Sequence, residues 1–530
     1  LEPSLLAFEA VYRSLAPQTD GQFGLAVQAY QKRGIAVLEW LQQLASGLHA
    51  RIPVRLVKGA YWDTEIKLAQ IRGLTGFPVF TRKSSTDVAY LACARSMLGA
   101  SGYLYPQFAT HNPHTVAWIL HEGARAEFEF QRLHGMGEEL YESVATISDA
   151  LRPCRVYAPV GTHQDLLPYL VRRLLENGAN TSFVNRFVNA EIDVTDLIRD
   201  PVEQTHALQS GIANPRIRLP SELFGDVRKN SFGVNLTNPS EISSFAAQLE
   251  SAATQSAEAA PVVAGRVCDG DRFAVRDPGN RDSVVGVARM ATPDTMKLAL
   301  DEAYTAFPAW NATAAPERAK ILRSAAQLLE QARAELVSIC VAEGGRTVVD
   351  ALAEIREAVD FLRYYAREAE KLCSASQQLP GPTGESNALR MSGRGVFVCI
   401  SPWNFPVAIF TGQIAAALAT GNTVIAKPAE QTSLAAAKIV SLLIDAGIPG
   451  GALQFLPAAG RLVGETLLPD PRVAGVAFTG STETAKTIER TLAKREGPIA
   501  TLIAETGGIN AMIVDSSALA EQVVKDAAVS

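Results

Sequence analysis

The sequence predicts an α/β protein built of two parallel-sheet domains, and three observations lead to this prediction. Between residues 20 and 190, short apolar runs that end in a polar residue alternate with amphipathic helices. From residue 394 onward, a second alternation of apolar strands and helices follows. The 530-residue chain is 47% hydrophobic and 20% charged, which is typical of a globular protein of several domains.

Composition narrows the class of protein further. The formal net charge of −6 gives no basic surface for nucleic acid. Six scattered cysteines without a C-x-x-C pair favour reduced thiols and a cytoplasmic location. No run of 18 apolar residues lacks a polar interruption, and no secretory signal is present. Because the chain opens and stops within helical patterns, we expect it to be part of a longer polypeptide.

The first domain is predicted to be a (β/α)8 barrel. From Gln28, the polar strand ends follow at steps of 27, 27, 29, 20 and 26 residues, and they are Arg55, Arg82, His111, Gln131 and Tyr157. Parallel strands need crossovers of this length, and a barrel of this kind repeats about every 30 residues. Six units are recognisable, so about two would precede Leu1.

The predicted strand ends carry basic and amide side chains with almost no acid among them. Lys58, Lys83 and Arg132 extend the series. Any single one of these residues could merely cap an element or face solvent. Together, at the end of a barrel where active sites lie, they favour an anionic ligand such as a flavin pyrophosphate.

A helix in the run "YLVRRLLENGANTSFV" places Arg172 and Arg173 side by side, with Glu176 within pairing reach. Two interpretations stay open: a solvated face with one salt bridge, or a fork for a substrate carboxylate held in place by Glu176. His111, His114 and His121 do not indicate a metal site, because Pro113 interrupts them and no cysteine or paired carboxylate joins them.

The motifs "VRLVKGAYWD", "FATHNPHT", "FEFQRLHGMG" and "YLVRRLLENGANTSF" resemble the flavin-dependent proline dehydrogenase barrel, most of all in the bifunctional proline utilization A family. The resemblance implies that Arg172 and Arg173 bind the proline carboxylate and that Tyr157 and Tyr61 enclose the proline ring. It also implies contacts to FAD from Gln28, Arg55, Lys58, Trp62, His111 and Gln131. A lysine and an aspartate that this family uses would precede Leu1.

We expect the domains to be residues 1–214 (barrel), 215–261 (connector) and 262–530 (nucleotide-binding domain). The connector is a Pro/Gly/Asn-rich stretch followed by a weakly hydrophobic helix. After it we expect two long helices, over 296–310 and 316–345, and then a doubly wound sheet.

The second sheet lacks a G-x-G-x-x-G fingerprint but carries other signals. In "FTGST", Gly480 lets the backbone approach a phosphate and Ser481 opens a helix whose amides favour anions. Lys427 and Glu430 end a strand and could hold an adenosine ribose, although each taken alone is better explained as a cap or turn residue. Glu505, a lone acid between two apolar runs, requires a task or a partner.

"SPWNFP", "KPAEQT", "FTGST" and "AETGGIN" together are similar to the aldehyde dehydrogenase superfamily, and the barrel before them points to 1-pyrroline-5-carboxylate dehydrogenase. The resemblance makes Glu505 the general base and Asn404 the oxyanion donor. It assigns Lys427 and Glu430 to the ribose of NAD, and Gly480 and Ser481 to its pyrophosphate. The nucleophilic cysteine would lie past Ser530, while Cys399 belongs to the core.

The sequence therefore predicts two-step oxidation of L-proline to L-glutamate through 1-pyrroline-5-carboxylate and glutamate semialdehyde, with FAD and then NAD. The resemblance further implies a membrane quinone as electron acceptor, peripheral association with the inner face of a membrane, a homo-oligomer and passage of the intermediate between the two sites. Two alternatives stay open. The barrel could be a non-catalytic scaffold for an aldehyde dehydrogenase, or the whole protein could double as a DNA-binding repressor through residues before Leu1.

Overall fold

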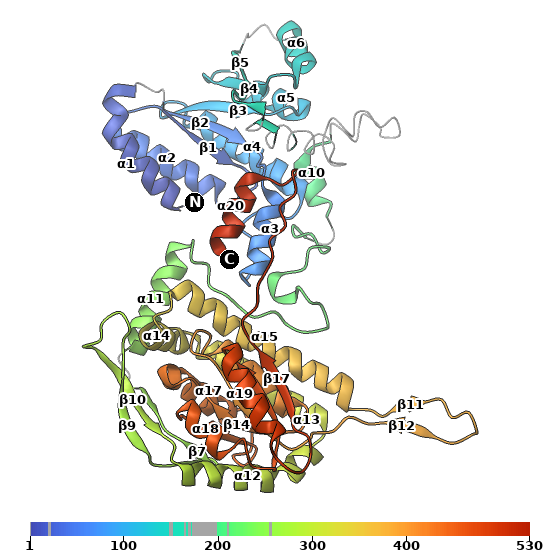
Figure 1. Cartoon of the computed structure of the whole chain (residues 1–530). Helices are drawn as coiled ribbons and strands as arrows, with labels where there is room; N and C mark the ends of the chain where they lie inside the picture. The colour runs from blue at the N-terminus through green and yellow to red at the C-terminus, as the bar shows by residue number, and fades with distance from the viewer. Residues whose placement is uncertain are drawn as a thin grey trace. The chain divides into compact units, whose positions relative to one another are not determined.

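The computed structural model describes residues 2–19, 23–147, 152–163, 166–167, 171, 199–208, 211–253 and 257–530. The chain divides into two compact units, coloured from blue to red along the sequence in Figure 1. The first comprises residues 1–71, 76–220 and 512–530, and the second comprises residues 72–75 and 221–511.

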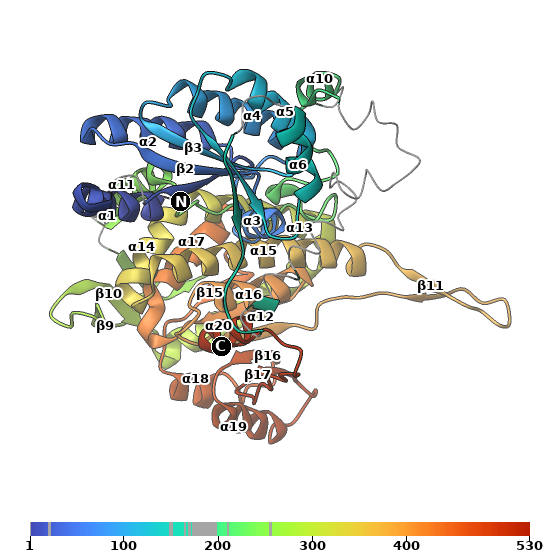
Figure 2. The ribbon, with the colours of Figure 1, turned by 90° about the horizontal axis from the view of Figure 1, so that it is seen from above.

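The first unit contains a five-stranded parallel sheet with the sequential order β1-β2-β3-β4-β5. The strands are β1 (Leu25–Gln28), β2 (Ile52–Val57), β3 (Leu104–Ala109), β4 (Glu129–Leu133) and β5 (Cys154–Tyr157). The helices are α1 (Glu2–Thr19), α2 (Gly34–Leu48), α3 (Trp62–Ile71), α4 (Lys83–Gly99), α5 (Pro113–Glu122), α6 (Glu138–Ile147), α10 (Pro201–His206) and α20 (Ala520–Val529). Figure 2 shows α2, α4 and α5 along one face of these strands.

Alternation along the strands explains why one face of this sheet is apolar. Val54, Leu56, Phe108 and Phe130 are buried in one core with residues of α2, α4 and α5. The residues between them therefore point to the opposite face. The sequential parallel order with intervening helices is the one expected for a (β/α) barrel.

The strand expected over "FPVFT" is absent, so this part of the prediction was wrong. Val79 forms only an isolated antiparallel bridge with Gln31, and β2 pairs directly with β3. Pro78 and Phe80 instead exchange backbone hydrogen bonds with the loop after β1, where the Pro78 carbonyl accepts from Lys32. Arg82 consequently lies at the start of α4 and not at a strand end.

The second unit is organised around a seven-stranded sheet of order β17-β16-β13-β14-β15-β7-β8. Its strands are β7 (Val262–Val263), β8 (Arg266–Val267), β13 (Val396–Ile400), β14 (Thr423–Lys427), β15 (Leu453–Phe455), β16 (Val473–Thr479) and β17 (Thr501–Glu505), of which β13 to β17 are parallel. The helices are α11 (Pro239–Ala253), α12 (Pro293–Ala312), α13 (Ala315–Gln331), α14 (Arg333–Gly344), α15 (Val348–Cys373), α16 (Ala408–Ala419), α17 (Ser433–Asp445), α18 (Gly460–Thr466) and α19 (Thr482–Ala493), with short 3-10 turns η1 (Pro220–Glu222) and η2 (Glu430–Thr432).

This sheet is buried on both faces, as a doubly wound sheet requires. Phe397 and Cys399 of β13 belong to a core that includes residues of α13 to α17. Val396 and Val398 of the same strand belong to a separate core with residues of α12, α18 and α19. The doubly wound prediction is therefore confirmed, whereas the long helix expected over 316–345 is broken at Ala332 into α13 and α14.

Two smaller sheets complete the second unit. β6 (Ala257–Ala259), β10 (Val284–Met290) and β9 (Asp271–Arg276) form one of them in the order β6-β10-β9. The antiparallel hairpin of β11 (Gln377–Leu379) and β12 (Asn387–Leu389) forms the other. Both views show this hairpin extending away from the helices of its unit (Figures 1 and 2).

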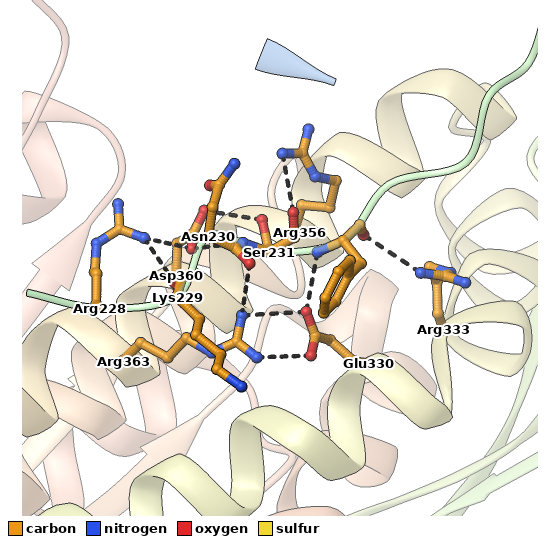
Figure 3. Close-up of polar contacts among 10 residues, drawn as sticks. Arg228, Lys229, Asn230, Ser231, Glu330, Arg333, Arg356, Asp360 and Arg363 are labelled. Carbon is orange, nitrogen blue, oxygen red and sulfur yellow. Dashed lines mark hydrogen bonds and ion pairs between the residues drawn. The ribbon is translucent and has the colours of Figure 1, made fainter. Parts of the chain in front are cut away.

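The connector is fixed to α13 and α15 by a dense polar network (Figure 3). The carboxylate of Asp360 accepts hydrogen bonds from Arg228 Nη1 at 2.6 Å and from Ser231 Oγ and N at 2.9 and 3.2 Å. Ser231 is fully buried. This part of the connector, predicted to be a docking segment at a domain boundary, is thus docked on the second unit.

Glu330 of α13 anchors Phe232, the next residue of the connector. It accepts a hydrogen bond from the Phe232 amide at 3.0 Å and pairs with both terminal nitrogens of Arg363 at 3.1 and 2.6 Å (Figure 3). Gly233 then packs so closely that a Cβ there would stand 1.9 Å from the Arg72 carbonyl oxygen. Only glycine fits this position.

Within the part of the chain that the structure describes, none of the helices combines the length and apolar character needed to cross a membrane.

Candidate active sites

The face of the first sheet that lies opposite the helices carries a continuous polar layer. Strand register places Arg55 beside Gln107 and Gln107 beside Glu129, while Gln131 lies beside Arg155. Six side chains from four neighbouring strands share this face, and they are Arg55, Gln107, Glu129, Gln131, Arg155 and Tyr157.

Glu129 is the centre of this layer, and sequence reasoning missed it. Its carboxylate is buried and accepts hydrogen bonds from Gln107 and Gln131 at 2.9 and 2.8 Å and from Arg155 at 2.9 and 2.8 Å. Burial raises the pKa of Glu129, but the Arg155 and Gln131 hydrogen bonds outweigh it and hold the pKa below its ordinary value. Because a carboxylate only accepts, both amides turn their NH2 groups toward it.

Arg55 and Tyr157, which were predicted independently, meet on this face. The Arg55 guanidinium lies 4.2 Å from the centre of the Tyr157 ring. Its Nε is buried and has no hydrogen-bond partner among the described residues. A partly buried arginine with an unused Nε donor fits an anionic group, as the flavin prediction requires.

Lys58 and Trp62 have partners that the sequence did not reveal. Lys58 forms an ion pair with Asp87 of α4, and Lys83 lies 4.0 Å from the same carboxylate. Trp62 donates its indole N–H to the Phe80 carbonyl at 2.8 Å. Asp87 therefore partly neutralises the positive charge that was predicted at Lys58 and Lys83. The Trp62 N–H is already bound to Phe80, so its ring is the part that remains for a ligand.

His111 and Gln28 lie at the ends of β3 and β1, as expected. The imidazole of His111 packs against Gly137, where a Cβ would stand 2.7 Å from the ring and where φ is +68°. Both the close approach and the left-handed backbone require glycine at this position. Tyr61 is 46% exposed in the loop before α3. Arg172, Arg173 and Glu176 lie outside the described residues.

In the second unit, the predicted site residues gather at the carboxyl ends of four adjacent parallel strands. Asn404 follows β13, Lys427 ends β14, Gly480 follows β16 and Glu505 ends β17. Ligands of doubly wound sheets bind at this edge. Asn404 and Glu505 are both exposed.

Lys427 and Glu430 both lie near Gly460, at the carboxyl end of β14. Lys427 is buried, and burial lowers its pKa although Glu430 opposes that effect. Glu430 accepts a hydrogen bond from the Gly460 amide at 3.2 Å. A Cβ on Gly460 would stand 3.8 Å from Lys427 Nζ. The arrangement fits a polar group held between the lysine and the carboxylate.

Gly480 and Ser481 form the turn between β16 and α19. The Gly480 amide donates to the Glu505 carbonyl at 3.1 Å, and a Cβ there would stand 2.6 Å from the Phe478 ring. The Ser481 hydroxyl accepts from the Thr484 amide at 3.2 Å and caps α19. Ser481 is thus a helix cap, which leaves the first amides of α19 available for an anion.

Gln413 of α16 is a further residue that sequence reasoning missed. Its amide nitrogen donates to the Ile400 carbonyl at 3.3 Å and to Thr479 Oγ1 at 3.0 Å. These bonds tie together the ends of β13 and β16. The sequence contains one signal that could have identified Gln413: it is a single glutamine within a largely apolar helix.

The cysteines do not contribute to either site. All six are free thiols, and Cys399 is fully buried, so its assignment to the core is confirmed. Burial raises the pKa of the Cys399 thiol to about 12, which makes it a poor nucleophile. Among the described residues, no group of three His, Cys, Asp or Glu side chains is arranged to hold a metal ion.

Two family models match separate segments of the chain. Residues 266–530 match the model of the aldehyde dehydrogenase family, and residues 1–186 match the model of proline dehydrogenase. The chain belongs to the aldehyde dehydrogenase family and, with the proline dehydrogenase segment in front, is of the proline utilization A (PutA) type.

Two relatives illustrate this likeness over almost the whole chain. The bifunctional protein PutA of Salmonella typhimurium is 51% identical over 95% of this chain. The crystal structure of the D779W mutant of Bradyrhizobium japonicum proline utilization A is 48% identical over 98% of this chain, with a TM-score of 0.87.

The second half has its own relatives. The 1-pyrroline-5-carboxylate dehydrogenase of Anoxybacillus flavithermus is 39% identical over 49% of this chain and 51% of its own length. This chain spans 38% of the length of the Salmonella protein and 50% of the Bradyrhizobium chain.

Proposed function

We propose that this chain takes part in the two-step oxidation of L-proline to L-glutamate. The observation that carries the proposal is the convergence of Asn404, Lys427, Gly480 and Glu505 at four adjacent strand ends of a family-typical sheet. The first step yields 1-pyrroline-5-carboxylate, which opens with water to glutamate semialdehyde, and the second step oxidises that aldehyde. FAD, when bound, accepts a hydride from proline, and NAD, when bound, accepts one from the aldehyde carbon.

In the first unit, the residues available to FAD are Gln28, Arg55, Lys58, Trp62, His111 and Gln131. The unused Nε of Arg55 supports a contact to an electronegative group of the flavin. Tyr157 and Tyr61 would enclose the proline ring. Arg172 and Arg173 would bind its carboxylate, with Glu176 orienting them.

In the second unit, Asn404 donates its amide to the oxyanion that develops on the aldehyde carbon. Glu505 would accept a proton from the water that cleaves the thioester to the cysteine expected past Ser530, which frees glutamate and the thiol. Lys427 and Glu430 hold the adenosine ribose of NAD, and the Gly480–Ser481 turn approaches the pyrophosphate at the start of α19. The Gly460 amide supports the ribose assignment, because it donates to Glu430 at 3.2 Å and so orients that carboxylate near Lys427.

We extend the proposal to the partners implied by the resemblance. Electrons would leave the flavin for a membrane quinone, which involves peripheral association with the inner face of the membrane. The protein would be a homo-oligomer, and this segment would bind no nucleic acid, in keeping with its net charge of −6. Quinone reduction assays test the electron acceptor, and light scattering tests the oligomeric state.

An anaerobic visible spectrum of the full-length protein, before and after L-proline is added, tests the first step. Bleaching of the oxidised flavin band by proline is the expected result. A flavin band that proline leaves unchanged would refute proline as substrate. Absence of flavin would favour the scaffold alternative, in which only the second unit acts as an enzyme.

A further inference from the structure

Two buried glutamates of the second unit each contact the start of another helix. The proposed mechanism uses neither of them. Glu343 lies in the last turn of α14 and Glu354 lies in the second turn of α15. Their exposed fractions are 4% and 1%. A carboxylate this deeply buried is costly unless hydrogen bonds satisfy it.

Each of these carboxylates binds the start of another helix. Glu343 accepts hydrogen bonds from the Leu434 amide at 2.7 Å and the Ala435 amide at 2.9 Å, one to each oxygen. These two amides belong to the first turn of α17. The four leading amides of a helix lack partners within the helix, and its dipole favours a negative charge there.

Glu354 does the same for α16. Its Oε1 accepts from the Val407 amide at 2.7 Å and from the Ala408 amide at 3.2 Å. The N-cap residues of α16 and α17 make no side-chain capping hydrogen bond of their own. Glu354 and Glu343 therefore replace the local caps with caps supplied by other helices.

The two capped helices begin directly after the loops that carry predicted site residues. The loop from β13 to α16 contains Asn404, and the turn from β14 to α17 contains Glu430 and follows Lys427. β13 and β14 are neighbours in the sheet. Each buried glutamate thus fixes the far end of one site loop.

A second contact reinforces the grip on the Asn404 loop. The Arg346 guanidinium lies 5.0 Å from the centre of the Phe405 ring, and its Nε lies 3.7 Å from Glu354 Oε2. Phe405 is the residue after Asn404. Glu354 consequently holds this loop both through the helix amides and through Arg346.

We propose that Glu354 and Glu343 are positioning residues with separate roles: Glu354 orients the Asn404 loop for the chemical step, and Glu343 orients the Lys427–Glu430 turn for NAD binding. This inference rests on the proposed aldehyde oxidation. It predicts that the loss of one glutamate alters turnover while the loss of the other alters cofactor affinity.

The test compares Glu354→Met and Glu343→Met in the full-length protein. Glutamate semialdehyde serves as substrate, and NAD affinity is measured separately by calorimetric titration. Glu354→Met should lower kcat by roughly 100-fold, because small misplacements of a catalytic group have effects of this size. Its NAD affinity should stay near the wild-type value. Glu343→Met should weaken NAD binding about tenfold, because the Leu434 and Ala435 amides at the start of α17 lose their acceptor, with kcat near the wild-type value.

Conservative and control variants separate positioning from folding. Glu354→Gln keeps an oxygen that can accept from both amides, so part of the lost kcat should return. Glu335→Gln, on the same helix as Glu343 but partly exposed and paired with Lys438, should change neither quantity. If Glu354→Met fails to fold, Arg346→Met, which leaves both amide bonds of Glu354 intact, should lower kcat without affecting NAD affinity.

Parallel losses of kcat and NAD affinity in both folded methionine variants would overturn the positioning proposal. Two folded methionine variants that behave like the wild type would also overturn it, while the proposed function would stand. A wild-type protein that does not oxidise the aldehyde with NAD would refute the proposed function, and the positioning proposal with it.

Discussion

At the scale of single residues, four candidate side chains of the second unit mark one edge of its sheet. Asn404, Lys427, Gly480 and Glu505 lie at strand ends as expected. Lys58 pairs with Asp87, 29 residues away, and Arg155 pairs with Glu129, 26 residues away. Which acid meets which base depends on side chains that local pattern does not bring together.

The carboxylate fork predicted at Arg172 and Arg173 can be tested by substitution. Arg173→Met should raise the KM for proline by roughly tenfold or more, because a charged hydrogen bond to the substrate is lost, while flavin stays bound. Steady-state kinetics and the visible spectrum measure these two properties. Arg125→Met, at an exposed arginine, is the matched control. An unchanged KM would remove Arg173 from the carboxylate site.

Glu343 should make stability depend on pH in a recognisable direction. Burial raises the pKa of its carboxyl from 4.5 to about 8, against the opposing effect of the Ala435 and Leu434 amides. The unfolded chain therefore loses this proton at lower pH than the folded chain. Its contribution to stability is complete below about pH 4.5 and is lost as pH rises through about 8.

Urea unfolding across this pH range checks the expectation. The free energy of unfolding of Glu343→Gln, relative to the wild type, should improve as pH rises, since glutamine does not titrate. Glu335→Gln provides the control on the same helix. A wild-type and variant difference that is constant with pH would contradict the raised pKa.

At the scale of elements, tertiary contacts overrode the local pattern of one segment and fixed another in place. "FPVFT" has the composition of a strand, yet its backbone bonds go to the loop after β1. The docking of the connector, which was predicted, also depends on such contacts, because its residues 228–233 are fixed to α13 and α15. In both cases, hydrogen bonds to residues distant in sequence decided the outcome.

Asp360→Ala tests the attachment of the connector. It frees Arg228 and leaves the buried amide and hydroxyl of Ser231 without an acceptor, which should cost about 3 kcal/mol of unfolding free energy. Limited proteolysis should then cut between residues 224 and 235 faster than in the wild type. Glu368→Ala, which removes a partly exposed pair on the same helix, should change stability by less than about 1 kcal/mol. Equal protease resistance in Asp360→Ala and the wild type would show that other contacts hold the connector.

At the scale of the whole molecule, each compact unit has its own core, so we expect two calorimetric transitions. NAD at 100 times its dissociation constant should stabilise the second unit alone, by about 2.7 kcal/mol. Lys427→Met should remove this shift, and Lys320→Met, at an exposed lysine of α13, should keep it. A shift of both transitions by NAD would contradict independent units.

The sequence by itself determined the α/β class, the two domains and the strand ends that bear the candidate residues. These features depend on hydrophobic periodicity, turn residues and short motifs, which are local properties of the chain. Tertiary structure alone decided the pairing of β2 with β3, the Glu129 network, the partners of the connector and the caps supplied by Glu343 and Glu354. The Glu354 carboxylate and the Val407 amide lie 53 residues apart, and only the packing of α15 against α16 brings them within 2.7 Å.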